Sequence, residues 1–343
     1  MAKFYSSNRL HHLTKLLSLI AVVFVVTGCS DPAQSLMDDY AKRLGRTLAL
    51  ELQDPAPLDL KPLPSITATR AEIAETSISL VELVATRSCG LDLLLGERNS
   101  SLGKVMPPSQ RLKYELAFLK QVQPCLTNPD IAPDLQQKLS AIASDKAAQI
   151  NKHWQNFLQQ DETLRQQLHP YRSLSEPDSV AGVAETMQAL HSLLALQQSI
   201  AQQNWQQASS INPEQALEAL YKANTLSQLQ QSLGFSQNWL QSLNQQLEQL
   251  DLKAQCPAGK SSDKAEILNT ILLQYFIGKV QLYLAQVDGT YQQLYPLLEQ
   301  LYKGTALAQP IEQRFKVPNT ALKAELKRHV IWWKAVQQHC PKS

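Results

Sequence analysis

One stretch of the chain, Gly96–Leu119, gathers residue types that could do chemistry. It reads GERNSSLGKVMPPSQRLKYELAFL and combines charged groups, glycines and a Pro-Pro pair. Ser101 and Lys104 stand three residues apart, the spacing of a serine nucleophile and a lysine base one helical turn away. The same pattern recurs at Ser261 and Lys264, and the Lys-Thr-Gly motif that accompanies it in acyl-transfer enzymes is absent. The serine–lysine pair therefore does not predict that chemistry.

Glutamates in the same stretch suit a second kind of chemistry. Glu97 or Glu115 could be the single general acid of a helical peptidoglycan-cleaving enzyme similar to the lytic transglycosylases. The Glu-Ser start and the Gly-Leu-Met-Gln segment of that class are absent, and loop ion pairs, turns and interhelical contacts explain each of these polar residues better than catalysis does. The candidate functional residues of this predicted polar loop and its flank are Glu97, Arg98, Asn99, Ser100, Lys104, Tyr114 and Glu115.

The N-terminal residues resemble an export signal that ends in a lipid attachment site. Three positive charges in residues 1–15 precede an eleven-residue apolar run, Leu16–Val26. This run has the length of a signal-peptide core and is shorter than the roughly 20 residues of a membrane span. Val26-Thr27-Gly28-Cys29 then resembles the lipobox of bacterial lipoproteins, whose thiol receives diacylglycerol before cleavage. The pattern predicts a signal peptide over residues 1–28 and a lipid on Cys29.

A lipidated Cys29 predicts where the protein resides and which machinery handles it. More than one acyl chain anchors a protein stably, and the triacylated cysteine of this class provides that. Ser30, rather than aspartate, follows the cysteine, as in lipoproteins sorted to the outer membrane, although Asp31 one place later leaves the inner membrane open. We expect an outer-membrane protein facing the periplasm, with the membrane and the lipoprotein processing and sorting machinery as partners.

The other four cysteines follow from export to an oxidising compartment, where an even set usually pairs. Three connectivities are open, and we favour Cys89–Cys125 and Cys256–Cys340 because each pair lies within one half of the chain. The sequence has no Cys-x-x-Cys and no His-x-x-x-His, so it predicts no metal site. It predicts no cofactor apart from the covalent lipid.

Composition describes a globular protein of near-neutral charge. The chain has 343 residues, of which 44% are hydrophobic and 18% charged. Lys3, Arg9 and Lys15 in the signal peptide account for more than the formal net charge of +2. The remaining chain lacks the clustered basic residues that displace counterions from phosphates, so we expect no nucleic-acid partner.

The apolar residues recur at three and four rather than at two, and only 11 glycines interrupt them, so the predicted class is all-α. We expect a multi-helix bundle or stacked helical hairpins over residues 69–343, with 69–170 and 175–343 as optional subdomains. Residues 29–68 would form a lipidated tether, with a short helix at Gln34–Leu48 and a Pro-rich spacer. That spacer either lifts the domain off the membrane or packs along its surface.

Several boundaries follow from prolines, glycines and capping residues. The other predicted helices are Arg70–Leu95, Ser109–Gln123, Ala132–Leu158, Pro177–Trp205, Pro213–Leu233 and Thr320–Gln338. Gly234 and Ser236 predict a helix stop and a fresh N-cap within a hairpin over residues 226–250. Residues 267–287 are apolar nearly all round and predict a buried central helix.

The lipobox, together with ERNSSLGKV and LKYELAFL, resembles an uncharacterised lipoprotein family of gammaproteobacteria, known only as a domain of unknown function. This resemblance covers nearly the whole mature chain and implies an envelope lipoprotein without an established activity or site. We expect a non-catalytic binding, scaffold or accessory protein of the cell envelope, with an envelope protein or peptidoglycan as partner. The alternative is the helical peptidoglycan-active enzyme.

Overall fold

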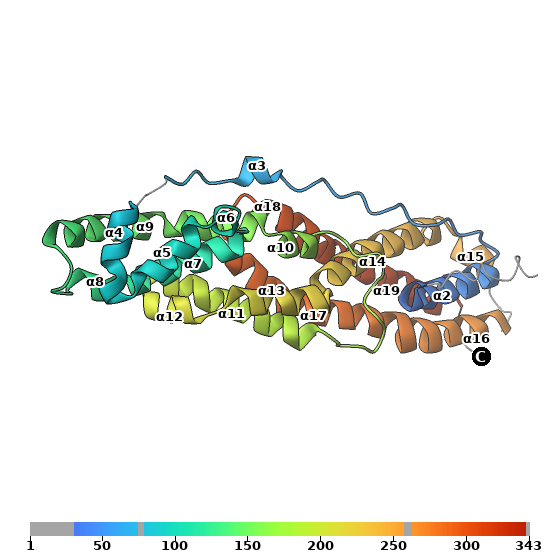
Figure 1. The fold of residues 1–343 in the computed structure, drawn as a ribbon. Helices are drawn as coiled ribbons and strands as arrows, with labels where there is room; N and C mark the ends of the chain where they lie inside the picture. The colour runs from blue at the N-terminus through green and yellow to red at the C-terminus, as the bar shows by residue number, and fades with distance from the viewer. Residues whose placement is uncertain (1–30, 75–78, 257–262, 341–343) are drawn as a thin grey trace, which may run out of the picture.

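The computed structural model describes residues 31–74, 79–256 and 263–340. These residues form helices and connecting segments without a strand, so the all-α prediction is confirmed. The helices stack along one long axis into an elongated body, with α4 and α8 near one end and α2, α15 and α16 near the other (Figure 1). Within the described part of the chain, no helix is both long and apolar enough to cross a membrane.

Most of the helices follow one another with short connections, apart from the long segments between α2 and α4 and between α10 and α11. In chain order they are α2 (Pro32–Leu48), α3 (Ile66–Thr69), α4 (Leu80–Ala85), η1 (Thr86–Cys89), α5 (Leu91–Asn99), α6 (Ser101–Lys104), α7 (Pro108–Gln121), α8 (Gln123–Leu126), α9 (Pro133–Gln160) and α10 (Glu162–Gln167). They continue with α11 (Val183–Ala201), α12 (Trp205–Ser210), α13 (Pro213–Ala223), α14 (Thr225–Leu247), α15 (Leu252–Gln255), α16 (Asp263–Thr270), η2 (Ile271–Val280), α17 (Gln281–Leu301), α18 (Ala308–Ile311), η3 (Glu312–Lys316) and α19 (Val317–His339). Several long helices begin at a proline, which costs no hydrogen bond there.

Two hydrophobic cores lie along the body. The larger core draws buried side chains from Ala33 in α2 to Cys340 after α19, and both predicted subdomains contribute to it. The smaller core lies between α5, α7, α8 and the first half of α9, and includes Leu91, Phe118 and Leu139. We call residues 79–143 the small-core end and the remaining helices the main body.

Each region contains one disulfide, in the pairing that the sequence favours. Cys89 and Cys125 join η1 to α8 at the small-core end, with Cα atoms 5.2 Å apart. Cys256 and Cys340 join the end of α15 to the end of α19 in the main body, with Cα atoms 5.3 Å apart. Cys29 lies outside the described residues, so its lipidation stays a prediction.

Residues 49–74, which we call the strap, run extended along the length of the body (Figure 1). Prolines keep this segment from forming regular helix, and side-chain amides of the body bond its backbone in place of a neighbouring strand. Three amides each donate to and accept from one strap residue: Gln246 with Gln53, Asn156 with Ala71, and Gln149 with Ala74. Of the two alternatives for the Pro-rich segment, the structure has the one in which it packs on the domain.

Two predicted helices begin or end elsewhere because of left-handed backbone. The prediction of one helix over Arg70–Leu95 is wrong, since the strap continues to residue 74 and Gly90, with φ of 75°, separates η1 from α5. The helix predicted at Pro177–Trp205 begins at Val183, after Gly182 with φ of 76°. Both glycines adopt a conformation that other residues rarely take.

Gly234 has a different role from the predicted helix stop. Helix α14 continues through it, and the chain turns instead at Asn224, whose φ is 51°. A Cβ atom at Gly234 would collide with the side chain of Leu58 in the strap. Glycine therefore lets the strap approach α14 closely, which a sequence pattern of helix ends does not reveal.

The helix that runs through α16, η2 and α17 is buried on one side only. Its inward side contributes Phe276, Val280 and Tyr283 to the larger core. Leu273, Ile277 and Leu282 are exposed. The prediction of burial all round is therefore wrong for residues 267–287.

Candidate functional site

The predicted polar loop over residues 96–110 is mostly helical. It comprises the end of α5, all of α6 and the start of α7. The Ser100 hydroxyl accepts a hydrogen bond from Gly103 N (3.0 Å) and donates one to Glu97 O (2.7 Å), which caps α6. Arg98 Nη1 donates to Gly103 O (2.7 Å). These bonds stack α6 on the end of α5, so the polar residues of this segment serve local structure.

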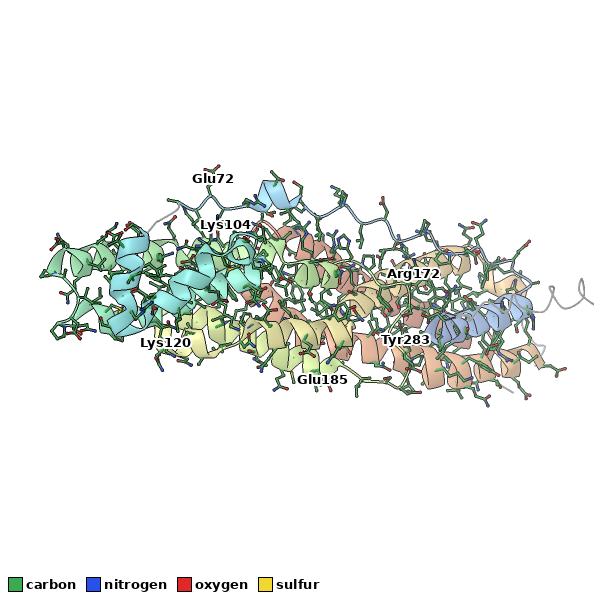
Figure 2. All side chains as sticks on the ribbon, viewed as in Figure 1. Glu72, Lys104, Lys120, Arg172, Glu185 and Tyr283 are labelled. Atoms are coloured by element: carbon green, nitrogen blue, oxygen red, sulfur yellow. A yellow bond between two sulfur atoms is a disulfide. The ribbon has the colours of Figure 1, made fainter. Side chains whose placement is uncertain are left out.

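The candidate residues separate into an outer and an inner set. Glu97, Asn99, Ser100 and Lys104 are exposed. Figure 2 shows Lys104 on the side of the body along which the strap runs. None of these four residues lines any of the three cavities described below. The outer set therefore lies outside these three cavities.

The inner set lies on α7 and meets cations of α7 and α9. Glu115 is fully buried, and its Oε2 lies 2.7 Å from Lys146 Nζ while its Oε1 lies 2.9 Å from Arg111 Nε. His153 Nε2 lies 3.8 Å from the same Oε1. The ring of the buried Tyr114 lies 5.5 Å from Lys146 Nζ, a cation–π distance. Glu115 thus has a positive partner on each oxygen.

Electrostatics around Glu115 are those of a structural ion pair. Burial lowers the pKa of His153 to about 4, with Glu115 opposing the shift and the nearby cations adding to it, so this imidazole is neutral at pH 7. Arg111 and Lys146 therefore neutralise the carboxylate. A general acid would need access to a sugar, whereas Glu115 is buried and lines none of the three cavities.

The ion pair marks the boundary between the two cores. On α9, Ile142 belongs to the smaller core and Ile150 to the larger, with Lys146 between them. On α7, which carries Glu115, Leu116 belongs to the larger core and Phe118 to the smaller. Sequence reasoning missed Arg111, Lys146 and His153. Lys146 and His153 interrupt the apolar stripe of α9 at core-facing positions, and that interruption was the available signal.

A second buried polar cluster, also missed, joins α2 to α14 and α19. Trp333 Nε1 donates to Tyr40 Oη (2.9 Å), which donates to His329 Nε2 (2.6 Å). Asn244 Nδ2 donates to the Glu325 carbonyl (2.8 Å), so its Oδ1 is the acceptor for His329 Nδ1 (2.8 Å). Burial lowers the pKa of His329 to about 3, and the imidazole stays neutral. Each ring, hydroxyl and amide atom in this series of hydrogen bonds has a protein partner, so none of these atoms is free to bind a ligand.

Three cavities open on the surface of the main body. The largest, about 910 Å³, lies between α9, α11 and α17 and is lined mainly by amide side chains with Trp154, His191 and Lys303. A cavity of about 650 Å³ lies near the start of α11, and one of about 530 Å³ lies between α2, the strap and α14. Among the described residues, no group of three or more His, Cys, Asp or Glu side chains is placed to hold a metal ion.

The small-core end instead exposes large apolar side chains around the candidate segment. They are Val81 and Val84 on α4, Leu93 on α5, Leu102 on α6, and Val105 directly after α6, and each is between 55% and 82% exposed. We call these five residues the α4–α6 patch. Such a group of exposed apolar residues on neighbouring elements is typical of an interaction surface. This region therefore exposes apolar side chains to solvent, and the exposed charged residues Glu97 and Lys104 are close to them in the sequence.

The model of one protein family, described as a protein of unknown function (DUF3080), matches residues 37–343. The chain belongs to this family. The DUF3080 region begins within α2, so it contains the strap, the smaller core, the α4–α6 patch and the larger core apart from Ala33. No curated protein and no solved structure matches the chain.

Proposed function

We propose that this protein is an outer-membrane lipoprotein that faces the periplasm and works by binding an envelope protein rather than by catalysis. The α4–α6 patch carries the proposal. Four of its five large apolar side chains lie on the short helices α4, α5 and α6, and Val105 directly follows α6. Figure 1 shows these helices in the half of the body away from α2, and thus away from the proposed lipid on Cys29. An anchored body with an apolar surface away from its anchor suits an accessory subunit, which needs contact area and no reacting groups.

A protein partner suits this surface better than peptidoglycan. Glycan strands and their peptides are polar and are bound through hydrogen bonds, whereas the patch offers aliphatic side chains. Leu102 is 82% exposed and has the charged residues Glu97 and Lys104 close by in the chain, as in an interface with an apolar centre and a polar rim. The partner we expect therefore has an exposed apolar surface of its own.

Photo-crosslinking in growing cells tests this proposal. A benzophenone amino acid at Leu102 should form one discrete protein adduct at native expression level. The same group at Ile331, an exposed apolar residue of α19, is the matched control and should form none. The binding proposal fails if neither site forms an adduct, or if both form the same adducts.

The enzyme alternative has its own test. Glu115 is paired with two cations, and Glu97 lines none of the three cavities, so neither is placed to protonate a glycosidic oxygen. We expect the purified protein to leave peptidoglycan intact. Digestion that Glu97→Gln or Glu115→Gln abolished, while the variant kept its helical circular dichroism, would overturn the non-catalytic proposal.

Anchoring is tested separately through Cys29. The Cys29→Ser variant cannot receive diacylglycerol on a thiol, so we expect it to remain unprocessed by the lipoprotein signal peptidase and to keep its signal peptide. A Cys29→Ser protein that was still membrane-bound and fully processed would contradict the lipobox interpretation.

A further inference from the structure

Side-chain amides of the body hold the strap by one recurring arrangement. The amide nitrogen donates to the carbonyl of a strap residue, and the amide oxygen accepts from the backbone N–H of the same residue. Asn156 bonds Ala71 in this way at 3.0 and 2.8 Å, and Gln149 bonds Ala74 at 3.4 and 2.6 Å. One amide thereby satisfies both backbone groups of an extended residue without a neighbouring strand.

The dimensions of a helix and of an extended chain allow this arrangement to repeat. Gln149 and Asn156 are seven residues apart on α9, about 10.5 Å along the helix axis. Their partners, Ala74 and Ala71, are three residues apart, about 10 Å of extended chain. Because these two lengths match, amides placed at intervals along a helix can follow an extended backbone.

The largest cavity, of about 910 Å³, is lined by five further amide side chains. They are Asn151 and Gln155 on α9, Gln197 and Gln198 on α11, and Gln300 on α17. Within the described part of the chain, only the amide of Gln197 has a hydrogen-bond partner. Asn151 and Gln155 are one turn apart, about 6 Å. That distance is close to the length of two extended residues, about 6.6 Å.

The walls of this cavity are held in place without the four unbonded amides. Gln197 Nε2 donates to the Leu301 carbonyl at the end of α17 (3.3 Å). Gln159 Oε1, one turn beyond the cavity on α9, accepts from Ala306 N (2.9 Å). These two bonds fix the turn after α17, which contributes Lys303 to the lining. The cavity is therefore preformed, and a ligand would have to order little more than the amide side chains themselves.

The charge of the lining limits the class of ligand. No Asp or Glu lines this cavity, whereas three line each of the other two cavities. Lys303 is its only Lys or Arg. A phosphorylated ligand would lack the several cations that bind phosphate well, and a cationic ligand would lack an acidic partner. Trp154, Leu194 and Leu297 add apolar surface to the lining. These properties suit an uncharged polar chain, with Lys303 available to one acidic group.

We propose that this cavity binds an extended peptide segment of a partner protein through the peptide backbone, in the manner in which the body holds the strap. A sugar chain is the competing ligand, because amides also bond hydroxyl groups. The strap favours a peptide, since α9 already binds a peptide backbone with amides of the same kind.

The length of the cavity and its place in the molecule define the proposed site further. His191 and Ala201 bound its lining on α11 and are ten residues apart, about 15 Å along the helix axis. Four or five extended residues span that distance. No residue of the lining belongs to the α4–α6 patch, so the inference depends neither on that patch nor on the lipid.

Peptide selection with a depletion step tests the site. A phage library of random twelve-residue peptides is depleted on the Asn151→Ala/Gln155→Ala variant and then selected on the full chain. Depletion removes peptides that bind elsewhere, the α4–α6 patch included. The two amides have no protein partner and neither residue is buried, so the variant should keep its helical circular dichroism. Gln202→Ala with Gln206→Ala, at exposed positions outside the three cavities, is the matched control.

Fluorescence anisotropy then measures the affinity of a synthetic, fluorescein-labelled form of the selected peptide. We expect equal affinity for the parent protein and the control, and about tenfold or weaker binding to the Asn151→Ala/Gln155→Ala variant. Two N-methylated forms of the peptide, one for each set of alternate residues, lack backbone N–H groups but keep every side chain. Alternate residues of an extended chain face opposite ways, so one form should lose binding and the other should keep it.

Three outcomes would overturn the proposal. The first is that depletion leaves no peptide to select, or that the selected peptide binds the Asn151→Ala/Gln155→Ala variant as tightly as the parent. The second is undiminished binding of both N-methylated forms, which would exclude recognition through the backbone. The third is binding of chitotetraose, an uncharged amino-sugar chain, that the same variant abolishes while no peptide is selected. That result would assign the cavity to a glycan.

Discussion

The small-core end and the main body are built from the same kind of helix yet are stabilised differently. In the main body, a large apolar core encloses a neutral hydrogen-bonded chain through Tyr40, His329 and Asn244. The small-core end buries ten apolar residues in its own cluster, and adds a disulfide, the Lys138–Glu82 ion pair and the buried Glu115 cluster. A small core contributes less burial per residue, so covalent and ionic cross-links matter more to it.

The largest expected effect comes from removing the cross-link of the smaller core. Cys89→Ser with Cys125→Ser releases a loop of 36 residues, which the chain-entropy model values at about 4 kcal/mol. Because the small-core end buries only a small apolar cluster, we expect it to unfold locally while the main body stays folded. Hydrogen exchange by mass spectrometry should show lost protection in α5 and α8 but not in α14.

The matched control removes the other disulfide. Cys256→Ser with Cys340→Ser releases a longer loop, of 84 residues, but leaves the larger core intact. We expect uniform destabilisation of the main body without a separately opening segment. If both pairs of substitutions lower protection evenly along the chain, the two regions form one cooperative unit and the contrast between them is wrong.

Breaking the ion pair at the boundary between the cores should have the next largest effect. Glu115→Gln keeps the shape of the side chain but leaves Lys146 buried without its counter-charge, and we expect the free energy of unfolding to fall by about 3 kcal/mol. Glu97→Gln makes the same chemical change at an exposed site and should cost less than about 0.5 kcal/mol. Urea unfolding followed by circular dichroism measures both, and equal losses would refute the structural role of Glu115.

Acid should destabilise the protein through two buried histidines, His153 beside the ion pair at the boundary between the cores and His329 within the larger core. Burial lowers the pKa of His153 to about 4 and that of His329 to about 3, whereas an unfolded histidine titrates near 6.5. The unfolded chain therefore takes up protons first, and stability falls as pH drops below about 6.5, by about 1 kcal/mol per pH unit for each histidine. Above pH 6.5 this contribution is constant.

Two variants separate these contributions. His153→Gln should make the free energy of unfolding depend less on pH between about 6.5 and 4. His329→Gln should do the same over a range that extends to about pH 3. Urea midpoints at pH 7, 5.5 and 4 give the comparison with the parent protein. A His329→Gln profile as steep as that of the parent would mean that the imidazole is charged in the folded state.

The smallest effect on stability is expected at the α4–α6 patch. Leu102→Ser removes an 82% exposed side chain, so the free energy of unfolding should change by less than about 0.5 kcal/mol. Leu95→Ala, on the neighbouring α5 but buried, should cost about 2 kcal/mol or more. Thermal unfolding distinguishes the two, and a large loss from Leu102→Ser would mean that the patch belongs to the core.

The local sequence pattern was enough to predict the long helices, but it did not predict the contacts between one element and another. The predicted helix Ala132–Leu158 matches α9 within two residues at each end, because 3.6-residue periodicity and Pro133 both act within a single segment. The role of Gly234 and the burial of Glu115 depend instead on Leu58 and Lys146, which are distant in the sequence. The strap shows the same limit, since its partners include single amides on two helices, α9 and α14, that are distant from it in the sequence.

The union of α2 with α19 has a consequence for the order of folding. Tyr40 and His329 are 289 positions apart, and a growing chain delivers the first of them long before the second. Until α19 has been synthesised, the core against which Met37, Tyr40 and Leu44 pack is incomplete, and so is the surface on which the strap lies. The native fold is therefore completed only after α19 has been synthesised, and until then the nascent chain stays incompletely folded and accessible to chaperones.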